Sequence, residues 1–225
     1  MGEDVEERHG GGAFDGLRVD EIEARAKPVV FRKAIVKSWP AFRKWDQMHG
    51  KANRLKELAG QARVDVMYSK DGDFNGDIRK HEKCGSNLSD VIDLMADAWD
   101  GRTPRASVYL AQNPIAKLGE ESCPLSPLMA DISMPQCLLR SKTPIEEVNF
   151  WLATQASCSS LHYDPYHNFL SVVRGTKQVT LMKPGSVQPN PVFSEASNHT
   201  AQDIDSRAGE ASVTVDLKAG DVLFL

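Results

Sequence analysis

The second half of the chain alternates between apolar and polar positions in short runs, the pattern of β-strands half buried in a sheet. In residues 212–217 every second residue is apolar, and four apolar residues follow at 222–225. The same reasoning predicts strands at residues 149–154, 168–173 and 177–182. Gly175 separates the last two and predicts a hairpin between them. Several short strands joined by turns predict a small barrel or jelly roll.

The first half of the chain mixes helical and strand patterns. Helices are predicted at residues 21–26, 38–48, 53–59 and 89–99, and strands at 28–32, 63–68 and 105–111. The helix at 89–99 has an apolar stripe at helical spacing, made of Leu88, Val91, Ile92, Met95 and Trp99. Either a core face or a partner-docking face explains such a stripe, and the core is favoured. Residues 113–144 contain five prolines and predict a long ordered loop with short helical turns.

Length and composition describe an ordinary globular chain of 225 residues, with 41% apolar and 26% charged residues. The acidic, Gly-rich residues 1–14 predict a disordered tail ahead of one domain at 15–225. The net charge of −4 gives no electrostatic reason to expect nucleic-acid binding. No window is apolar enough to predict a membrane span, and the acidic N-terminal residues do not predict a basic, apolar leader. Four scattered cysteines without CxxC spacing favour reduced thiols in the nucleus or cytoplasm over a secreted protein.

The candidate chemistry lies in residues 159–181. In an extended segment His162 and Asp164 share a face, which supplies two corners of the two-histidine, one-carboxylate site preferred by Fe(II). A His-x-Asp pair alone is common by chance. Lys177 begins an otherwise apolar strand face, where a lysine is costly unless a carboxylate meets it or its end reaches solvent. Ser159 and Asn168 add small polar groups where a packed core would favour apolar ones.

These residues lie in a stretch, LHYDPYHNFLSVVRGTKQVTLMKP, that resembles the metal-binding segment of the JmjC, cupin-like oxygenases. That family comprises hydroxylases dependent on iron and 2-oxoglutarate, and the likeness is to its small protein hydroxylases. Further likenesses follow in the family's order, at KPVVFRKAIVKSWPAFRKW, VYLAQNPI, NFWLA and LKAGDVLFL. They imply an α+β fold in which N-terminal helices and strands, to about residue 145, pack around a double-stranded β-helix, or jelly-roll, core at 146–225.

The resemblance also implies a role for each site residue. His162 and Asp164 become the metal and catalytic residues, as two ligands of Fe(II). Lys177 becomes the partner of the far carboxylate of 2-oxoglutarate, and Tyr109 and Ser159 become hydrogen-bond partners of the same carboxylate. Asn168 is implied to lie beside the cosubstrate. Of the neighbouring residues, Tyr163 and Tyr166 are expected as cavity walls, and His167 as a rim residue.

Two departures from the family pattern bear on this interpretation. Residues 156–160 replace the family's usual Gly-Thr-x-Thr-Pro, although Ser159 retains a hydroxyl group. The family's second histidine ligand follows a GDVLFL-like strand, whereas this chain ends at Leu225, so a C-terminally truncated chain is expected. His199, in a polar loop, is a poor substitute.

The expected function is therefore an Fe(II)- and 2-oxoglutarate-dependent dioxygenase that uses O2 to hydroxylate a protein or peptide substrate. Demethylation is the less favoured chemistry, and a homodimer is left open. The alternative is a truncated, catalytically inactive interaction module that lacks the distal histidine. A metal-free cupin that binds a small molecule would leave Lys177 without a partner.

Overall fold

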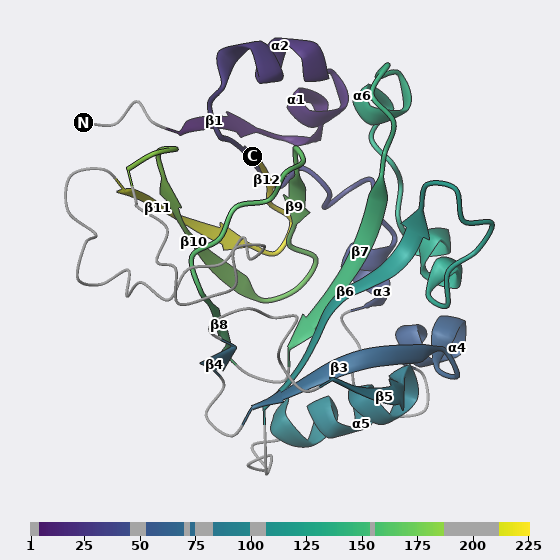
Figure 1. Ribbon diagram of the computed structural model, residues 1–225. Coiled ribbons are helices and arrows are strands. Elements are labelled where there is room, and N and C mark those ends of the chain that lie inside the picture. Colours follow the sequence, from purple (N-terminus) through teal and green to yellow (C-terminus); the bar gives the residue numbers. More distant parts are fainter. Residues whose placement is uncertain are drawn as a thin grey trace.

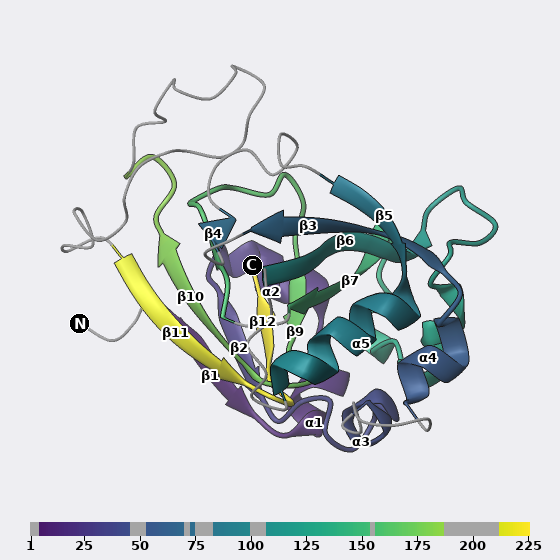
Figure 2. The same ribbon diagram turned by 90° about the horizontal axis from the view of Figure 1, so that it is seen from below.

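The computed structural model describes residues 5–45, 53–69, 73–74, 83–99, 107–153, 156–186 and 212–225. Four strands form an antiparallel sheet in the order β5-β3-β6-β7. Their bounds are Lys83–Asn87 for β5, Arg63–Ser69 for β3, Ser107–Lys117 for β6 and Glu147–Ala153 for β7. This sheet runs through the middle of the molecule, and helices α4 and α5 lie against one of its faces (Figures 1 and 2).

A second group of strands lies opposite that sheet (Figure 2). It includes a four-stranded sheet in the order β1-β2-β12-β9, in which β1 and β2 are parallel and the other pairs are antiparallel. These strands are Glu6–His9, Val29–Arg32, Val222–Phe224 and Phe169–Ser171. A separate antiparallel pair is formed by β10 (Thr176–Met182) and β11 (Ser212–Lys218). Two facing groups of mainly antiparallel strands, with helices around them, confirm the predicted α+β jelly-roll fold.

The helices are short apart from α5. They are α1 (Gly11–Asp15), α2 (Val19–Arg25), α3 (Ala41–Lys44), α4 (Arg54–Ala59), α5 (Leu88–Trp99) and α6 (Gln136–Leu139), with a 3-10 helix η2 at Ser126–Asp131. Asn53 caps α4 as expected, since its side-chain oxygen accepts from the N–H groups of Leu55 and Lys56. Four residues of the predicted stripe on α5 are core, since Leu88, Val91, Ile92 and Met95 are buried, whereas the side chain of Trp99 lies outside the described part of the structure.

The alternation along β6 and β7 gives the central sheet two different faces. One face packs on the helices in the main core, through residues such as Val108, Leu110 and Phe150. The opposite face carries Tyr109 and Trp151, and Tyr109 belongs to a smaller cluster with Met67 and Phe74. The sheet therefore separates a helix-covered core from the face on which the candidate site lies.

The predicted hairpin about Gly175 does not form. Gly175 does turn the chain, with a φ of +77°, but β9 pairs with β12 while β10 pairs with β11. The two strands therefore enter different sheets. Strand β12 lies between β2 and β9 and bonds to both, so the partner of β9 comes from the far end of the sequence.

The Pro-rich segment after residue 113 begins as a strand and not as a loop. Strand β6 continues to Lys117 through register shifts, with Gln112 at a φ of +51°. The Asn113 carboxamide replaces ladder hydrogen bonds: its oxygen accepts from the Asp65 N–H at 2.9 Å, and its nitrogen donates to the Asp65 carbonyl at 2.9 Å. A bulged strand therefore tolerates the asparagine and proline that suggested a loop. The expected short helical turns are η2 and α6.

The predicted N-terminal tail was wrong for residues 5–14. Glu6–His9 form β1 beside β2, and Phe14 on α1 is buried. The acidic residues that suggested disorder pair with arginines, since Glu6 lies 3.0 Å from Arg25 and Glu7 lies 2.6 Å from Arg32. The end of the second predicted helix, residues 46–48, lies outside the described residues. Among the described helices, none is both long and apolar enough to cross a membrane.

Candidate active site

Tyr109 and Trp151 come together because β6 and β7 are neighbours. Tyr109 is in register with Ala153, and Trp151 lies two residues earlier on the same face of β7. The two rings are 5.8 Å apart between centroids. Tyr109 is 6% exposed whereas Trp151 is 39% exposed, so the pair runs from the interior of the molecule to solvent.

Ser159 reaches Tyr109 from another element. Strand β8 (Cys158–Ser159) pairs in parallel with the short strand β4 (Asp73–Phe74). A side-chain hydrogen bond joins Tyr109 and Ser159. Burial raises the pKa of Tyr109 to about 12, and the hydrogen bond from Ser159 opposes part of that shift. Tyr109 is therefore a neutral hydroxyl at physiological pH, and the structure brings these two predicted residues together.

Lys177 lies on the inner face of β10. It is in register with Leu217 and shares its face with Val179 and Leu181, as predicted. Its Nζ lies 5.9 Å from the ring centroid of Trp151, which joins β10 to the central sheet. Desolvation lowers the pKa of Lys177, although the residue as a whole is exposed. Nearby protein, including the Trp151 ring, therefore desolvates the ammonium group only in part.

Lys177 also lacks an acidic partner within the part of the chain that the structure describes, where no Asp or Glu forms an ion pair with it. A desolvated ammonium group without a counter-charge is unfavourable. A strand-end lysine that projects into bulk water would not be desolvated in this way. The arrangement of Lys177, Tyr109 and Ser159 therefore suits an external anion that accepts hydrogen bonds.

His162 and Asp164 lie in the segment that joins β8 to β9, and both are exposed. The Nδ1 atom of His162 lies 2.8 Å from the Ser160 carbonyl oxygen. A carbonyl oxygen only accepts, so Nδ1 carries the proton and the lone pair of the neutral ring is on Nε2. A histidine that ligates a metal through Nε2 makes this kind of hydrogen bond on its other side. Among the described residues, no three His, Cys, Asp or Glu side chains gather as a metal site.

The remaining predicted residues surround this segment. Asn168 is placed by its backbone, which exchanges two hydrogen bonds of 3.0 Å with Leu225, and its side chain is exposed. The ring of His167 stacks on Phe224 with centroids 5.7 Å apart, as suits a rim residue. The side chains of Tyr163 and Tyr166 are also exposed. His199 lies outside the described residues.

Sequence reasoning missed Phe74 and Trp151 as neighbours of the candidate site. Trp151 had a usable signal, because Phe150 and Leu152 alternate with it in NFWLA and place it on the opposite face from the core. Phe74 had none, because its position depends on the pairing of two two-residue strands.

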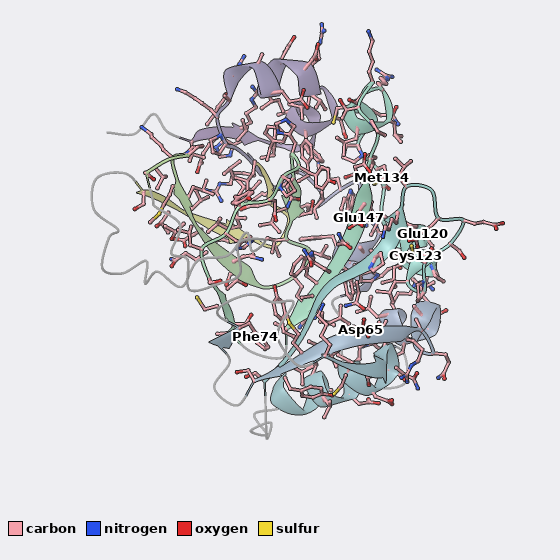
Figure 3. The ribbon with its side chains drawn as sticks, in the orientation of Figure 1. Asp65, Phe74, Glu120, Cys123, Met134 and Glu147 are labelled. Atoms are coloured by element: carbon pink, nitrogen blue, oxygen red, sulfur yellow. The ribbon has the colours of Figure 1, made fainter. Side chains whose placement is uncertain are left out.

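Two surface pockets lie elsewhere on the molecule. One, of about 250 Å³, is lined by Asp65, Asn113 and neighbouring residues, and the other, of about 260 Å³, by Met134, Val148 and neighbouring residues. Figure 3 labels Asp65 and Met134, which lie away from β4 and β8. Neither pocket contains a residue of the Lys177 cluster, so the chemistry of the side chains, and not the pockets, locates the candidate site.

A family model described as a cupin-like domain matches residues 17–225. Lysine-specific demethylase JMJ31 of Arabidopsis thaliana is 33% identical over 238 aligned positions, which cover 91% of this chain and 43% of that protein. The chain belongs to the cupin-like JmjC family.

Other members of the family match over shorter spans. JmjC domain-containing protein D of Dictyostelium discoideum is 29% identical over 73% of this chain and 37% of that protein. The human bifunctional peptidase and (3S)-lysyl hydroxylase JMJD7 is 28% identical over 72% of this chain and 49% of that protein. The chain thus spans less than half the length of each of these three relatives. The enzyme names among them include a demethylase and a hydroxylase.

Proposed function

We propose that this JmjC-family protein is an Fe(II)- and 2-oxoglutarate-dependent oxygenase that hydroxylates a side chain of a protein or peptide. The observation that carries the proposal is a set of three side chains near Trp151: Lys177 on β10, Tyr109 on β6 and Ser159 on β8. Lys177 and Tyr109 both lie beside the ring of Trp151, Tyr109 is hydrogen-bonded to Ser159, and no acidic residue in the described part of the chain pairs with the lysine.

The cluster fits the far carboxylate of 2-oxoglutarate. A carboxylate would accept hydrogen bonds from the ammonium and hydroxyl groups, and such charge-assisted bonds are the strong ones in proteins. It would also supply the counter-charge that desolvated Lys177 otherwise lacks. The partly exposed Trp151 covers one side of Lys177 and helps to keep the ammonium group charged, because the face of an aromatic ring attracts a cation.

The residues of the β8–β9 segment fit Fe(II). His162 would bind through Nε2 and Asp164 through its carboxylate, the nitrogen and oxygen ligands that suit this metal. The Ser160 carbonyl holds the imidazole in the required tautomer through the 2.8 Å contact at Nδ1. When bound, iron supplies oxygen activation coupled to the oxidative decarboxylation of 2-oxoglutarate. The protein residues orient the cosubstrate and keep its charge balanced.

The substrate class is proposed from the names of the relatives, which include a lysine-specific demethylase and a lysyl hydroxylase. Both names designate chemistry on protein side chains. Hydroxylation is our proposal for this chain, with demethylation as the competing outcome. We also propose a nuclear or cytoplasmic location and no direct role for nucleic acid. Mass spectrometry of peptides incubated with Fe(II) and 2-oxoglutarate distinguishes a gain of oxygen from the loss of a methyl group.

Succinate release from 2-oxoglutarate in the presence of Fe(II) tests the proposal. His162→Ala is expected to lower the rate by at least about 100-fold, because it removes a metal ligand. His167→Ala is the matched control, since that histidine lies in the same segment but stacks on Phe224. Lys177→Met is expected to weaken 2-oxoglutarate binding by at least about tenfold, whereas Lys218→Met, on the exposed face of β11, is not. A wild-type rate in His162→Ala would overturn the iron assignment.

A second candidate, an inactive interaction module, is favoured by one observation. The described residues supply two candidate ligands and no group of three. Titration with Mn(II), an inert substitute for Fe(II), distinguishes the two candidates. Weak Mn(II) binding together with no succinate release would favour the module. Tight binding at one metal per chain, lost in His162→Ala, would favour the enzyme.

A further inference from the structure

We propose that Phe74 is a positioning residue of the cosubstrate site, which holds Tyr109 and Ser159 together for the far carboxylate of 2-oxoglutarate. This inference rests on the proposed function. Phe74 lies on β4, in the connection between β3 and β5, far in sequence from every residue assigned above. Figure 3 places it between β8 and the adjoining ends of β6 and β7.

The side chain of Phe74 contacts one member of the hydrogen-bonded pair. Its ring is fully buried, and its centroid lies 5.1 Å from that of Tyr109 at an interplanar angle of 53°. Tyr109 also contacts Trp151, with ring centroids 5.8 Å apart. The tyrosine ring therefore has two aromatic neighbours, and these contacts limit its rotation and displacement.

The backbone of Phe74 contacts the other member of the pair. In the parallel pairing of β4 with β8, Phe74 is in register with Ser159. One residue therefore determines the position of both partners, the tyrosine through its ring and the serine through its strand. A substitution that removes the ring of Phe74 keeps the backbone pairing and should loosen the Tyr109–Ser159 hydrogen bond on the tyrosine side.

Phe74 does not belong to the main hydrophobic core. It belongs to a small cluster with Met67 and Tyr109, separate from the main core that packs on α4 and α5. Phe150 is the useful comparison, because it lies on β7 next to Trp151 but faces the main core, where its ring is 5.7 Å from that of Trp45. Loss of packing at Phe150 should lower stability without disturbing the cosubstrate site.

The test compares Phe74→Leu with Phe150→Leu by isothermal titration of 2-oxoglutarate in the presence of Mn(II). Phe74→Leu keeps an apolar side chain but removes the ring contact with Tyr109. It is expected to weaken 2-oxoglutarate binding by about 5- to 10-fold, the loss of one or two well-placed hydrogen bonds. Phe150→Leu is expected to bind as the wild type does, even where thermal unfolding shows it to be less stable.

A second ligand separates positioning from a general structural effect. 2-Oxopentanoate has the same chain length and the same 2-oxo acid end as 2-oxoglutarate but no far carboxylate. If Phe74 acts through Tyr109 and Ser159, Phe74→Leu lowers the affinity ratio of 2-oxoglutarate to 2-oxopentanoate. An unchanged ratio would overturn the inference, as would wild-type affinity for 2-oxoglutarate. If the wild-type protein and Lys177→Met bind 2-oxoglutarate equally, the proposed function fails instead.

Discussion

Lys177 illustrates, at the scale of a single residue, the cost of placing a binding group on an otherwise apolar strand face. Its neighbours on the same face of β10 are Val179 and Leu181, which pack into an apolar cluster shared by the β10–β11 pair and the sheet that contains β2 and β12. A residue chosen for stability there would also be apolar. The ammonium group is instead desolvated and its pKa is lowered, as expected for a group whose partner is a ligand.

We therefore expect Lys177→Met to stabilise the ligand-free protein. The lowered pKa means that folding disfavours the charged form, so the lysine destabilises the protein at neutral pH and up to its folded pKa. Because the side chain retains exposed surface and contacts Trp151, the gain is expected to be only about 0.5–1 kcal/mol. Chemical denaturation at pH 7 measures it, with Lys218→Met as the control. A clear loss of stability in Lys177→Met alone would contradict this account.

At the scale of an element, β6 shows how one side chain can maintain a strand through an irregular stretch. The carboxamide of Asn113 is buried and makes hydrogen bonds to the Asp65 N–H, the Asp65 carbonyl and the Ala111 carbonyl. The two bonds to Asp65 keep β6 attached to β3 beyond the end of their ladder at Val66 and Leu110, where the register of β6 against β7 shifts. They also fix the far end of the strand that carries Tyr109.

Asn113→Ala should destabilise the protein by about 1–3 kcal/mol, because it removes three hydrogen bonds and leaves buried backbone groups unpaired. Asn149→Ala is a matched control, since the Asn149 side chain is hydrogen-bonded to exposed Glu147 on β7. That control is expected to stay within about 0.5 kcal/mol of the wild type. Urea denaturation of the two variants provides the comparison. Equal effects would show that the carboxamide of Asn113 has no special role.

At the scale of the whole molecule, two buried carboxylates join parts of the chain that are distant in sequence. Asp131 lies 2.9 Å from Lys44, 3.2 Å from the Trp45 indole nitrogen and 2.9 Å from Arg54. Burial by itself would raise the pKa of Asp131, but the hydrogen bonds from these groups outweigh it and the pKa is lowered.

The pKa of the second carboxylate, Asp221, is also set by burial on one hand and hydrogen bonds on the other. Burial would raise its pKa, whereas hydrogen bonds from the Lys33 N–H, Arg32 and the Lys218 N–H lower it overall. Asp221 thereby connects β2 to the turn between β11 and β12. Both lowered pKa values favour the folded state whenever the carboxylates are ionised.

These shifts predict how stability depends on pH. The contributions are fully present above the unfolded pKa of about 3.9, and they are lost as the pH falls through the lower folded pKa values. At pH 7, Asp131→Asn is expected to cost about 2–4 kcal/mol, and this difference from the wild type should shrink below about pH 4. Urea denaturation between pH 7 and pH 3 checks this, with exposed Asp65→Asn as the control. A difference that stays constant to pH 3 would contradict the assignment.

The sequence alone determined the local features of this protein. Alternating apolar residues located most of the strands, and Asn53 predicted the start of the helix that follows it. The segment around His162 contains both candidate ligands within three residues. Lys177 and Ser159 could also be identified from the sequence, because both lie close to the His-x-Asp pair in the chain and occupy positions that match the family's metal-binding segment.

Only the tertiary structure decided which strands pair and which side chains meet across them. Strand β9 pairs with β12 and not with its neighbour β10, because the two strands join different sheets that enclose a common core. Phe74 meets Tyr109 and Ser159 through the pairing of β4 with β8, and Trp151 meets Lys177 across the two strand groups. Periodicity shows which face a residue occupies but not what lies opposite that face, since the packing of the whole chain determines the partner.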